Sequence, residues 1–264
     1  MYNFDYEKAA SADDAVKAAG GSDDVMFLAG GMTLIPTLKL RLTQPEKVVD
    51  VGGIGDMKGI SVSGDTVTIG AATTHADVAG SDDVKKAIPA LAKLASLIGD
   101  QQVRNRGTIG GSIANADPAA DYPAAVVGLG ATVKTNKREI AGDDFFTAMF
   151  ETALEPGELI TSVSFPVPEK ADYQKLANPA SGYAMVGVMV AKTKDGVRVG
   201  VTGAGPSAFR ASAIEDALGS DFSSDAAKGV TMSSDDLNND LHATAEYRAS
   251  CISTLAARAV KAIG

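Results

Sequence analysis

The chain has 264 residues, with 33 Asp and Glu against 24 Lys and Arg, a formal net charge of −9. This length fits one large domain or about two or three small ones, and so acidic a surface would repel a phosphate backbone, which argues against nucleic acid as a partner. The single cysteine, Cys251, excludes an intrachain disulfide framework and an iron–sulfur cluster ligated by this chain alone. The only two histidines, His75 and His242, are far apart in the sequence, which argues against a zinc site of the usual His/Cys type.

The N-terminal segment is not typical of a secretory signal. Its first residues, MYNFDYEKAASADDAV, lack a basic stretch followed by an apolar core. No apolar run in the chain approaches the roughly 20 residues that cross a bilayer. We therefore expect a cytoplasmic protein.

The first helix is expected after Ser11, where acidic residues suit the positive end of a helix, and Gly20-Gly21 provides a stop.

A short apolar run and two glycines then predict a small βαβ-like unit. Val25–Ala29 is typical of a buried strand. It leads through Gly30 and Gly31 into a helix-like stretch over residues 32–39. A second strand is expected over residues 47–51.

The middle of the chain begins with a hairpin pattern. Residues 60–69 alternate in polarity around Gly64-Asp65, which is typical of two strands and a tight turn. Helices are expected to start near Thr73 or Thr74 and again near Ser81. A further helix is expected over residues 88–98, whose apolar positions recur at helical spacing. These positions are Leu91, Leu94, Ala95 and Ile98.

Glycine, asparagine and aspartate are frequent in residues 99–118, which are expected to form a loop. Prolines between residues 156 and 168 then separate a third segment. This segment has strand patterns over residues 183–192 and 197–202, and it ends in a helix with Leu255 and Ala259 on one face. The sequence therefore predicts a mixed α/β (α+β) protein with three subdomains, residues 1–53, 54–168 and 169–264.

Two glycine loops are the main candidates for a binding site. One occupies residues 27–34, where a strand meets Gly30 and Gly31, and the other occupies residues 104–117. Glycines allow successive N–H groups to converge on an anion, and two such loops can hold the two phosphates of a dinucleotide. The alternative is that each is only a turn. Replacing Gly110 or Gly111 is expected to lower ligand content and to leave the fold largely intact.

Six segments in chain order resemble one family of flavoproteins. They are AGGMTLIPTLKLRL (residues 29–42), IGAATTHADV (69–78), QVRNRGTIGGSIANADPAADYPAA (102–125), EPGELITSVSFPVP (155–168), VTGAGPSAFRA (201–211) and DLHATAEYR (240–248). They resemble the FAD-binding medium subunit of molybdenum hydroxylases, the family of aerobic carbon monoxide dehydrogenase and xanthine dehydrogenase. The resemblance implies two FAD-binding subdomains of the PCMH and vanillyl-alcohol oxidase type, followed by a C-terminal α+β flavoprotein domain.

The resemblance also implies a set of FAD-binding residues. On one side of the pyrophosphate it places Ala29, Gly30, Gly31, Met32, Thr33 and Leu34, and on the other side Thr108, Gly110 and Gly111. It implies further contacts from Ile98, Asp121, Ile160, Lys175 and Tyr183, the last stacked on the isoalloxazine. For several of these an ordinary structural role is the alternative: helix core for Ile98, a helix start for Asp121, a solvated surface position for Lys175 and strand packing for Tyr183.

Two other residues are interpreted as structural, and two more stay open. His75 is expected to cap a helix or lie on the surface, and Cys251 is expected to be a buried thiol. For Arg104 and Arg106 two interpretations stay open, a phosphate contact and an ordinary ion pair.

The implied function is electron transfer with FAD as the cofactor of this chain. A large partner subunit would carry the molybdenum cofactor and a small one two [2Fe–2S] clusters, in a dimer of heterotrimers. No catalytic acid or base is expected in this chain. The alternatives are a free-standing flavin oxidase and a flavin-free scaffold subunit.

Overall fold

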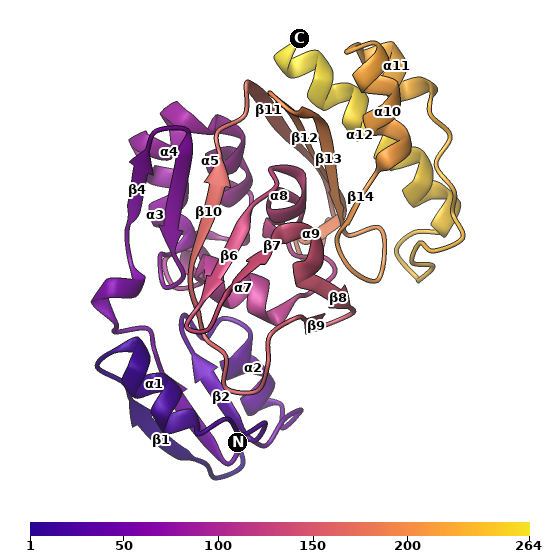
Figure 1. Ribbon diagram of the computed structural model, residues 1–264. Helices are drawn as coiled ribbons and strands as arrows, with labels where there is room; N and C mark the ends of the chain where they lie inside the picture. Colours follow the sequence, from indigo (N-terminus) through magenta and orange to yellow (C-terminus); the bar gives the residue numbers. More distant parts are fainter.

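The computed structural model describes all residues, 1–264, as three larger sheets and one two-stranded sheet, with helices packed around them (Figure 1). The strands are β1 Asp5–Lys8, β2 Val25–Leu28, β3 Lys47–Asp50, β4 Ile60–Ser63, β5 Thr66–Gly70, β6 Thr132–Thr135, β7 Glu139–Ala141, β8 Phe146–Ala148, β9 Glu151–Thr152, β10 Ile160–Pro166, β11 Lys170–Ala177, β12 Ala184–Thr193, β13 Gly196–Thr202 and β14 Phe209–Arg210. The α-helices are α1 Ala12–Ala19, α2 Leu34–Lys39, α3 His75–Gly80, α4 Asp82–Ala87, α5 Pro89–Ser96, α6 Gln101–Arg104, α7 Ile109–Asn115, α8 Tyr122–Gly128, α9 Gly142–Phe145, α10 Ser212–Ser220, α11 Ser224–Gly229 and α12 Ala245–Ile263. A short 3-10 helix, η1, spans Gly55–Met57.

The first sheet is parallel, with the strand order β1-β3-β2. The predicted βαβ-like unit is present as β2, α2 and β3, and the sequence pattern missed β1. The strand predicted over residues 25–29 is present as β2, but the prediction that it is buried was wrong. Met26 is exposed and its neighbours are only partly buried. The reason is that β2 is an edge strand and its residues line a cleft.

The second sheet is antiparallel and has the order β4-β5-β10-β6-β7. The hairpin of β4 and β5 was predicted, and Gly64 takes a positive φ of 55° in its turn. The central strand β10 is the last strand of this sheet in chain order. It pairs with β5 on one side and with β6 on the other, so it joins the hairpin of β4 and β5 to the hairpin of β6 and β7. Helices α4 and α7 lie against this sheet, because α4 contacts β4 and α7 contacts both β5 and β10.

Local capping explains which helices the sequence predicted. Thr74 forms a capping box with Asp77 at the start of α3, and Ser81 caps α4. The prediction of a loop over residues 99–118 was wrong, because Asp100 caps α6 and Thr108 caps α7 through the same kind of side-chain hydrogen bond. The high glycine and asparagine content of this segment hid those two caps.

The third sheet has the order β11-β12-β13-β14 and is covered on both faces. Along β12, Val186, Val188 and Val190 belong to one hydrophobic core with α10 and α12, whereas Met189 and Ala191 belong to the main core beneath α8. This alternation follows from the two-residue period of a strand. No helix combines the length and the apolar character that crossing a bilayer requires.

Candidate functional site

A cleft of about 920 Å³ is lined by segments from all three sheet regions. Every residue predicted to bind FAD lines this cleft except Lys175, which lies behind it and contacts Asp121. The lining residues from that prediction are Ala29, Gly30, Gly31, Met32, Thr33, Leu34, Ile98, Thr108, Gly110, Gly111, Asp121, Ile160 and Tyr183. Segments far apart in the sequence therefore meet at one site.

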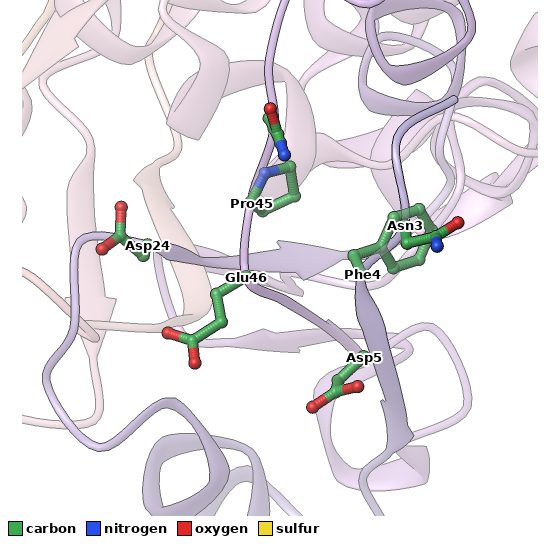
Figure 2. A pocket seen from close by; sticks show the side chains of 7 residues that line it. Asn3, Phe4, Asp5, Asp24, Pro45 and Glu46 are labelled. Atoms are coloured by element: carbon green, nitrogen blue, oxygen red, sulfur yellow. The ribbon is translucent and has the colours of Figure 1, made fainter.

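A second hollow of about 450 Å³ is more open and lies at the N-terminal ends of the three strands of the first sheet (Figure 2). It is lined by Asn3, Phe4, Asp5, Asp24, Gln44, Pro45 and Glu46. It contains no glycine and none of the predicted binding residues, so the cleft is the candidate site.

The two glycine loops are in direct contact. A Cβ on Gly30 would lie 1.9 Å from the carbonyl oxygen of Arg106 and 2.8 Å from the Cα of Gly107, so only glycine allows this approach. Gly31 takes a φ of +75°, a conformation that favours glycine. The main-chain N–H groups of Gly30, Gly31, Met32 and Thr33 donate to no protein acceptor. The first loop therefore presents four neighbouring donors at the cleft.

Around its two glycines, the second loop uses its N–H groups inside the protein. Ile109 donates to the carbonyl oxygen of Thr73 at 3.2 Å, and Gly110 donates to that of Ala71 at 2.9 Å. Gly111 donates to Oγ1 of Thr108 at 3.1 Å. The second loop therefore forms a wall of the cleft that offers two scattered main-chain donors, at Thr108 and Asp117, in place of a row of them.

Gly110 is required by packing and not by its backbone conformation. A Cβ on Gly110 would lie 2.6 Å from the Cβ of Ala71, whereas one on Gly111 would meet only Oγ1 of Thr108, at 3.0 Å. Neither glycine takes a positive φ. The expectation that both can be replaced without disturbing the fold is therefore wrong for Gly110.

Two polar residues at the cleft escaped the sequence analysis. Ser112 and Asn115 both line it, and neither side chain hydrogen-bonds within the protein. They lie one turn apart on α7, which places them on the same face of this helix. Because residues 99–118 were expected to form a loop, that helical spacing was not considered.

Asp121 and Lys175 form a buried ion pair, with both side chains only 4% exposed and Oδ2 of Asp121 2.8 Å from Nζ of Lys175. The hydroxyl of Tyr173 donates to Oδ1 of Asp121 at 2.6 Å, and Nζ of Lys175 also donates to the carbonyl oxygen of Leu97. Burial raises the pKa of Asp121, against the opposing effects of Lys175 and Tyr173. The interpretation of Lys175 as a solvated surface residue was therefore wrong. Asp121 stands at the start of α8, but its side chain does not cap that helix.

Tyr183 and Phe150 are large exposed side chains at the cleft, with 47% and 57% of their surfaces accessible. Burial, and then the carboxylates of Asp117 and Asp121, raise the pKa of Tyr183, which places these two acids near its ring. Tyr183 precedes β12, so the structure does not make it a strand residue. Ile98 is partly buried and lies two residues after the end of α5, so the helix expected over residues 88–98 is shorter than predicted. Ile160, the first residue of β10, is 4% exposed.

His75 is buried and lies at the cleft, so the expectation of a surface position was wrong. Its ring packs beside Gly107 and Tyr122, and its Nδ1 has no hydrogen-bond partner. Burial first, and the guanidinium of Arg104 second, lower the pKa of His75 to about 4. The capping role at this helix start belongs to Thr74.

Contacts within the protein bear on three further residues, Arg104, Arg106 and Cys251. The guanidinium of Arg104 donates to the carbonyl oxygens of Ile98 and Gly99 and forms no ion pair. Arg106 also forms no ion pair, and its main-chain carbonyl contacts the first glycine loop. Cys251 is only partly buried, so the prediction of a buried thiol was wrong.

The charged side chains that line the cleft are all acidic. They are Asp23, Asp100, Asp117, Asp121 and Glu158. No lysine or arginine is among the lining residues. An anion at this site must therefore be held by main-chain N–H groups and neutral side chains.

Comparisons with known proteins agree with this geometry. Residues 2–168 match the family model of the FAD-binding domain in molybdopterin dehydrogenase. The chain belongs to the FAD-binding medium subunits of the molybdenum hydroxylases. It is 34% identical to the glyceraldehyde dehydrogenase medium chain of Sulfolobus acidocaldarius, covering 98% of both chains.

Chains in two solved enzyme structures have the same fold. Carbon monoxide dehydrogenase from Hydrogenophaga pseudoflava matches with a TM-score of 0.88 and 34% identity, covering 99% of this chain and 97% of that one. Quinoline 2-oxidoreductase from Pseudomonas putida 86 matches with a TM-score of 0.89 and 27% identity, covering 100% and 97%. The medium subunit described here thus binds FAD and is part of an oxidoreductase complex. The cleft fits that cofactor in its free N–H donors and in a volume near the upper end for small-molecule sites.

Proposed function

We propose that this medium subunit is the electron-transfer subunit of its complex, receiving electrons from the [2Fe–2S] clusters of a small partner and passing them to an external acceptor. Bound FAD supplies the two-electron chemistry. The observation that carries the proposal is the row of free N–H groups at Gly30, Gly31, Met32 and Thr33, directly beside the second loop. A large partner with the molybdenum cofactor would oxidise the substrate.

The roles of individual residues follow from where they lie in the cleft. The four free N–H groups of the first loop would hold the pyrophosphate, with the hydroxyls of Thr108 and Ser112 facing it. Ile98 and Tyr183 would contact the isoalloxazine ring, because both lie near the pair formed by Asp121 and Lys175. Ile160 would supply an apolar wall next to Ala71, whose N–H group donates to the carbonyl oxygen of Thr161 at 2.9 Å. No residue of this chain is assigned a proton transfer.

We also propose that the three sheets correspond to subdomains 1–53, 54–168 and 169–264, the first two forming the FAD cleft. The proposed assembly is a dimer of heterotrimers, and a cytoplasmic location stays a prediction. Support for partners comes from the relatives, which are named as medium chains or subunits.

The test uses the purified full chain with and without its partners. The isolated chain is expected to carry about one non-covalent FAD, and its absorbance near about 450 nm should not fall when substrates of molybdenum hydroxylases are added without oxygen. Adding the small and large subunits should restore the bleaching. Bleaching by the single chain would instead support a free-standing oxidase, and a chain without flavin would support a scaffold.

A further inference from the structure

The segment of residues 240–248 lies outside the cleft, on the loop before α12 and on the first turn of that helix. Arg248 belongs to this turn, and its side chain is only 4% exposed although it carries a charge. Burying a guanidinium is unfavourable unless its N–H groups find acceptors. The acceptors that Arg248 uses therefore show what this part of the chain holds.

The guanidinium of Arg248 binds one carboxylate and two main-chain carbonyls. One terminal nitrogen donates to both carboxylate oxygens of Asp240, at 2.9 and 2.8 Å. The other terminal nitrogen donates to the carbonyl oxygen of Met185 at 2.6 Å and to that of Gly203 at 2.9 Å. The carboxylate is fixed in turn, because its Oδ1 also accepts from two main-chain N–H groups of its own loop. Asp240 thus orients Arg248 towards the main chain of the third sheet.

The two carbonyls belong to the ends of β12 and β13 that lie nearest the cleft. Met185 is the second residue of β12 and comes two residues after Tyr183, and Gly203 follows the last residue of β13. The pairing of the two strands does not extend to either of these residues. Arg248 therefore joins the two strands beyond their last paired residues.

The same strand ends hold the main chain that leads to Asp121. Three donors at these ends bind the carbonyl oxygens of residues 118–120, at 2.6 to 3.2 Å. The donors are the N–H groups of Ala184 and Gly203 and the hydroxyl of Thr202. Arg248 therefore supports a layer of main chain behind the cleft, and Tyr183 stands at the border of this layer.

Tyr183 itself has few restraints. Its N–H group donates to Oγ of Ser181 at 3.3 Å and its carbonyl oxygen accepts from the N–H group of Asn178 at 2.8 Å, so these bonds stay within one short loop. Its ring is 47% exposed. The segment that carries Arg248 contacts this loop a second time, where Nδ1 of His242 lies 3.2 Å from Nδ2 of Asn178. The place of the ring therefore depends on how the start of β12 is held.

We propose that Arg248, oriented by Asp240, is a positioning residue for Tyr183, and that it sets where this ring meets the isoalloxazine of bound FAD. The inference rests on the proposed function, which places Tyr183 at that ring. Arg248 does not line the cleft and acts only through the main chain two residues from Tyr183. A planar fork suits this role, because it can bind a carboxylate and two carbonyls in fixed directions at once.

Arg248→Lys tests this role in the FAD-loaded full chain. Lysine keeps the charge but has one nitrogen in place of the fork, so the start of β12 is no longer fixed and the ring should move off the flavin. The fluorescence of the bound flavin should rise, since a tyrosine ring in contact quenches the excited flavin by electron transfer. The dissociation constant for FAD should rise by about 2- to 10-fold, the equivalent of one aromatic contact.

A double-mutant cycle with Tyr183→Ala separates positioning from general destabilisation. If Arg248 acts through the ring, Arg248→Lys should change neither the affinity nor the fluorescence further once Tyr183 is alanine. Effects that add would show a merely structural role and overturn the inference. Arg210→Lys is the matched control, because its guanidinium also binds a carboxylate on this sheet, that of Glu215 at 2.7 and 2.9 Å. It should leave both flavin readouts at the wild-type values.

Asp240→Asn keeps the inference testable if Arg248→Lys does not fold. Its amide oxygen can still accept from the two N–H groups of the loop, and the Asp240 side chain is 43% exposed, so the fold should survive. Both readouts should shift in the same direction as in Arg248→Lys, and wild-type values in a folded variant at either position would overturn the inference alone. Wild-type readouts in Tyr183→Ala would instead contradict the place of this ring in the proposed function, and the inference with it.

Discussion

Glu158 is a single residue whose burial is offset by hydrogen bonds from three groups. It accepts from the Arg138 guanidinium at 3.0 and 3.1 Å, from the Thr135 hydroxyl at 2.7 Å and from the N–H group of Glu155 at 2.8 Å. Burial alone would raise the pKa of Glu158, but these bonds outweigh it and lower the pKa to about 2.

The lowered pKa of Glu158 predicts a pH-dependent contribution to stability. A carboxyl whose pKa is lower in the folded state than in the unfolded state stabilises the protein at pH values above its ordinary pKa of 4.5. That contribution is lost as the pH falls from 4.5 towards 2. Glu158→Gln should therefore lower the free energy of unfolding by about 1–3 kcal/mol at pH 7. Urea titrations should show the gap from the wild type closing near pH 2–3. A gap that is constant over this range would contradict the role given to its charge.

The residue scale also shows what a single sequence cannot reveal. His75 follows a capping threonine and looks like an ordinary helix start, yet its side chain is buried against Gly107 and Tyr122. Lys175 looks like a solvated surface residue, yet it is buried by its pairing with Asp121, 54 residues away. Neither burial has a local signal, because each depends on a contact between distant segments.

Among the elements, α7 offers the sharpest test of the second glycine loop. Gly111→Ala should leave the fold intact, because its Cβ would meet only Oγ1 of Thr108 and alanine favours a helix by about 1 kcal/mol over glycine. Its methyl group would project at the cleft, so FAD content should fall. Gly110→Ala is the comparison, and it should lower the unfolding free energy by about 1–3 kcal/mol through overpacking against Ala71.

These two variants are measured by flavin content and by urea unfolding. If the Gly111→Ala protein had a normal FAD content, the assignment of this loop to the FAD-binding site would be wrong. If Gly110→Ala were as stable as the wild type, the packing explanation for that glycine would fail.

Element prediction succeeded where the signal was local. Ser11, Thr74 and Ser81 each stand before a helix and accept a main-chain hydrogen bond in the structure. Asp100 and Thr108 do the same, but glycines and asparagines surround them, and composition was given more weight than capping. Strands β1 and β11 were missed because their residues are largely polar or exposed, so hydrophobic alternation is weak.

At the scale of the whole molecule, the pair formed by Asp121 and Lys175 links α8 to the third sheet behind the cleft. Lys175→Met should cost about 3–5 kcal/mol, because it leaves a carboxylate buried without its cation. Adding Asp121→Asn should recover much of this loss. Because burial already raises the pKa of Asp121, protonation relieves the unpaired charge, and the single variant should be less destabilised at pH 5 than at pH 8.

The measurement is a double-mutant cycle by urea unfolding at both pH values. A double variant no more stable than Lys175→Met alone would show that packing of the lysine chain, and not its charge, holds this side of the cleft.

The place of β10 in the second sheet has a consequence for the chain as it leaves the ribosome. Strands β5 and β6 are its two neighbours, yet both are synthesised before it, and β5 ends 90 residues before β10 begins. Until about the last third of translation, the hairpin of β4 and β5 and the hairpin of β6 and β7 each have an edge strand with unsatisfied N–H and C=O groups. Such edges pair readily with other chains, so the nascent subunit is most prone to aggregate in this interval. The wall of the cleft that contains Ala71 and Ile160 is completed only when β10 inserts between β5 and β6.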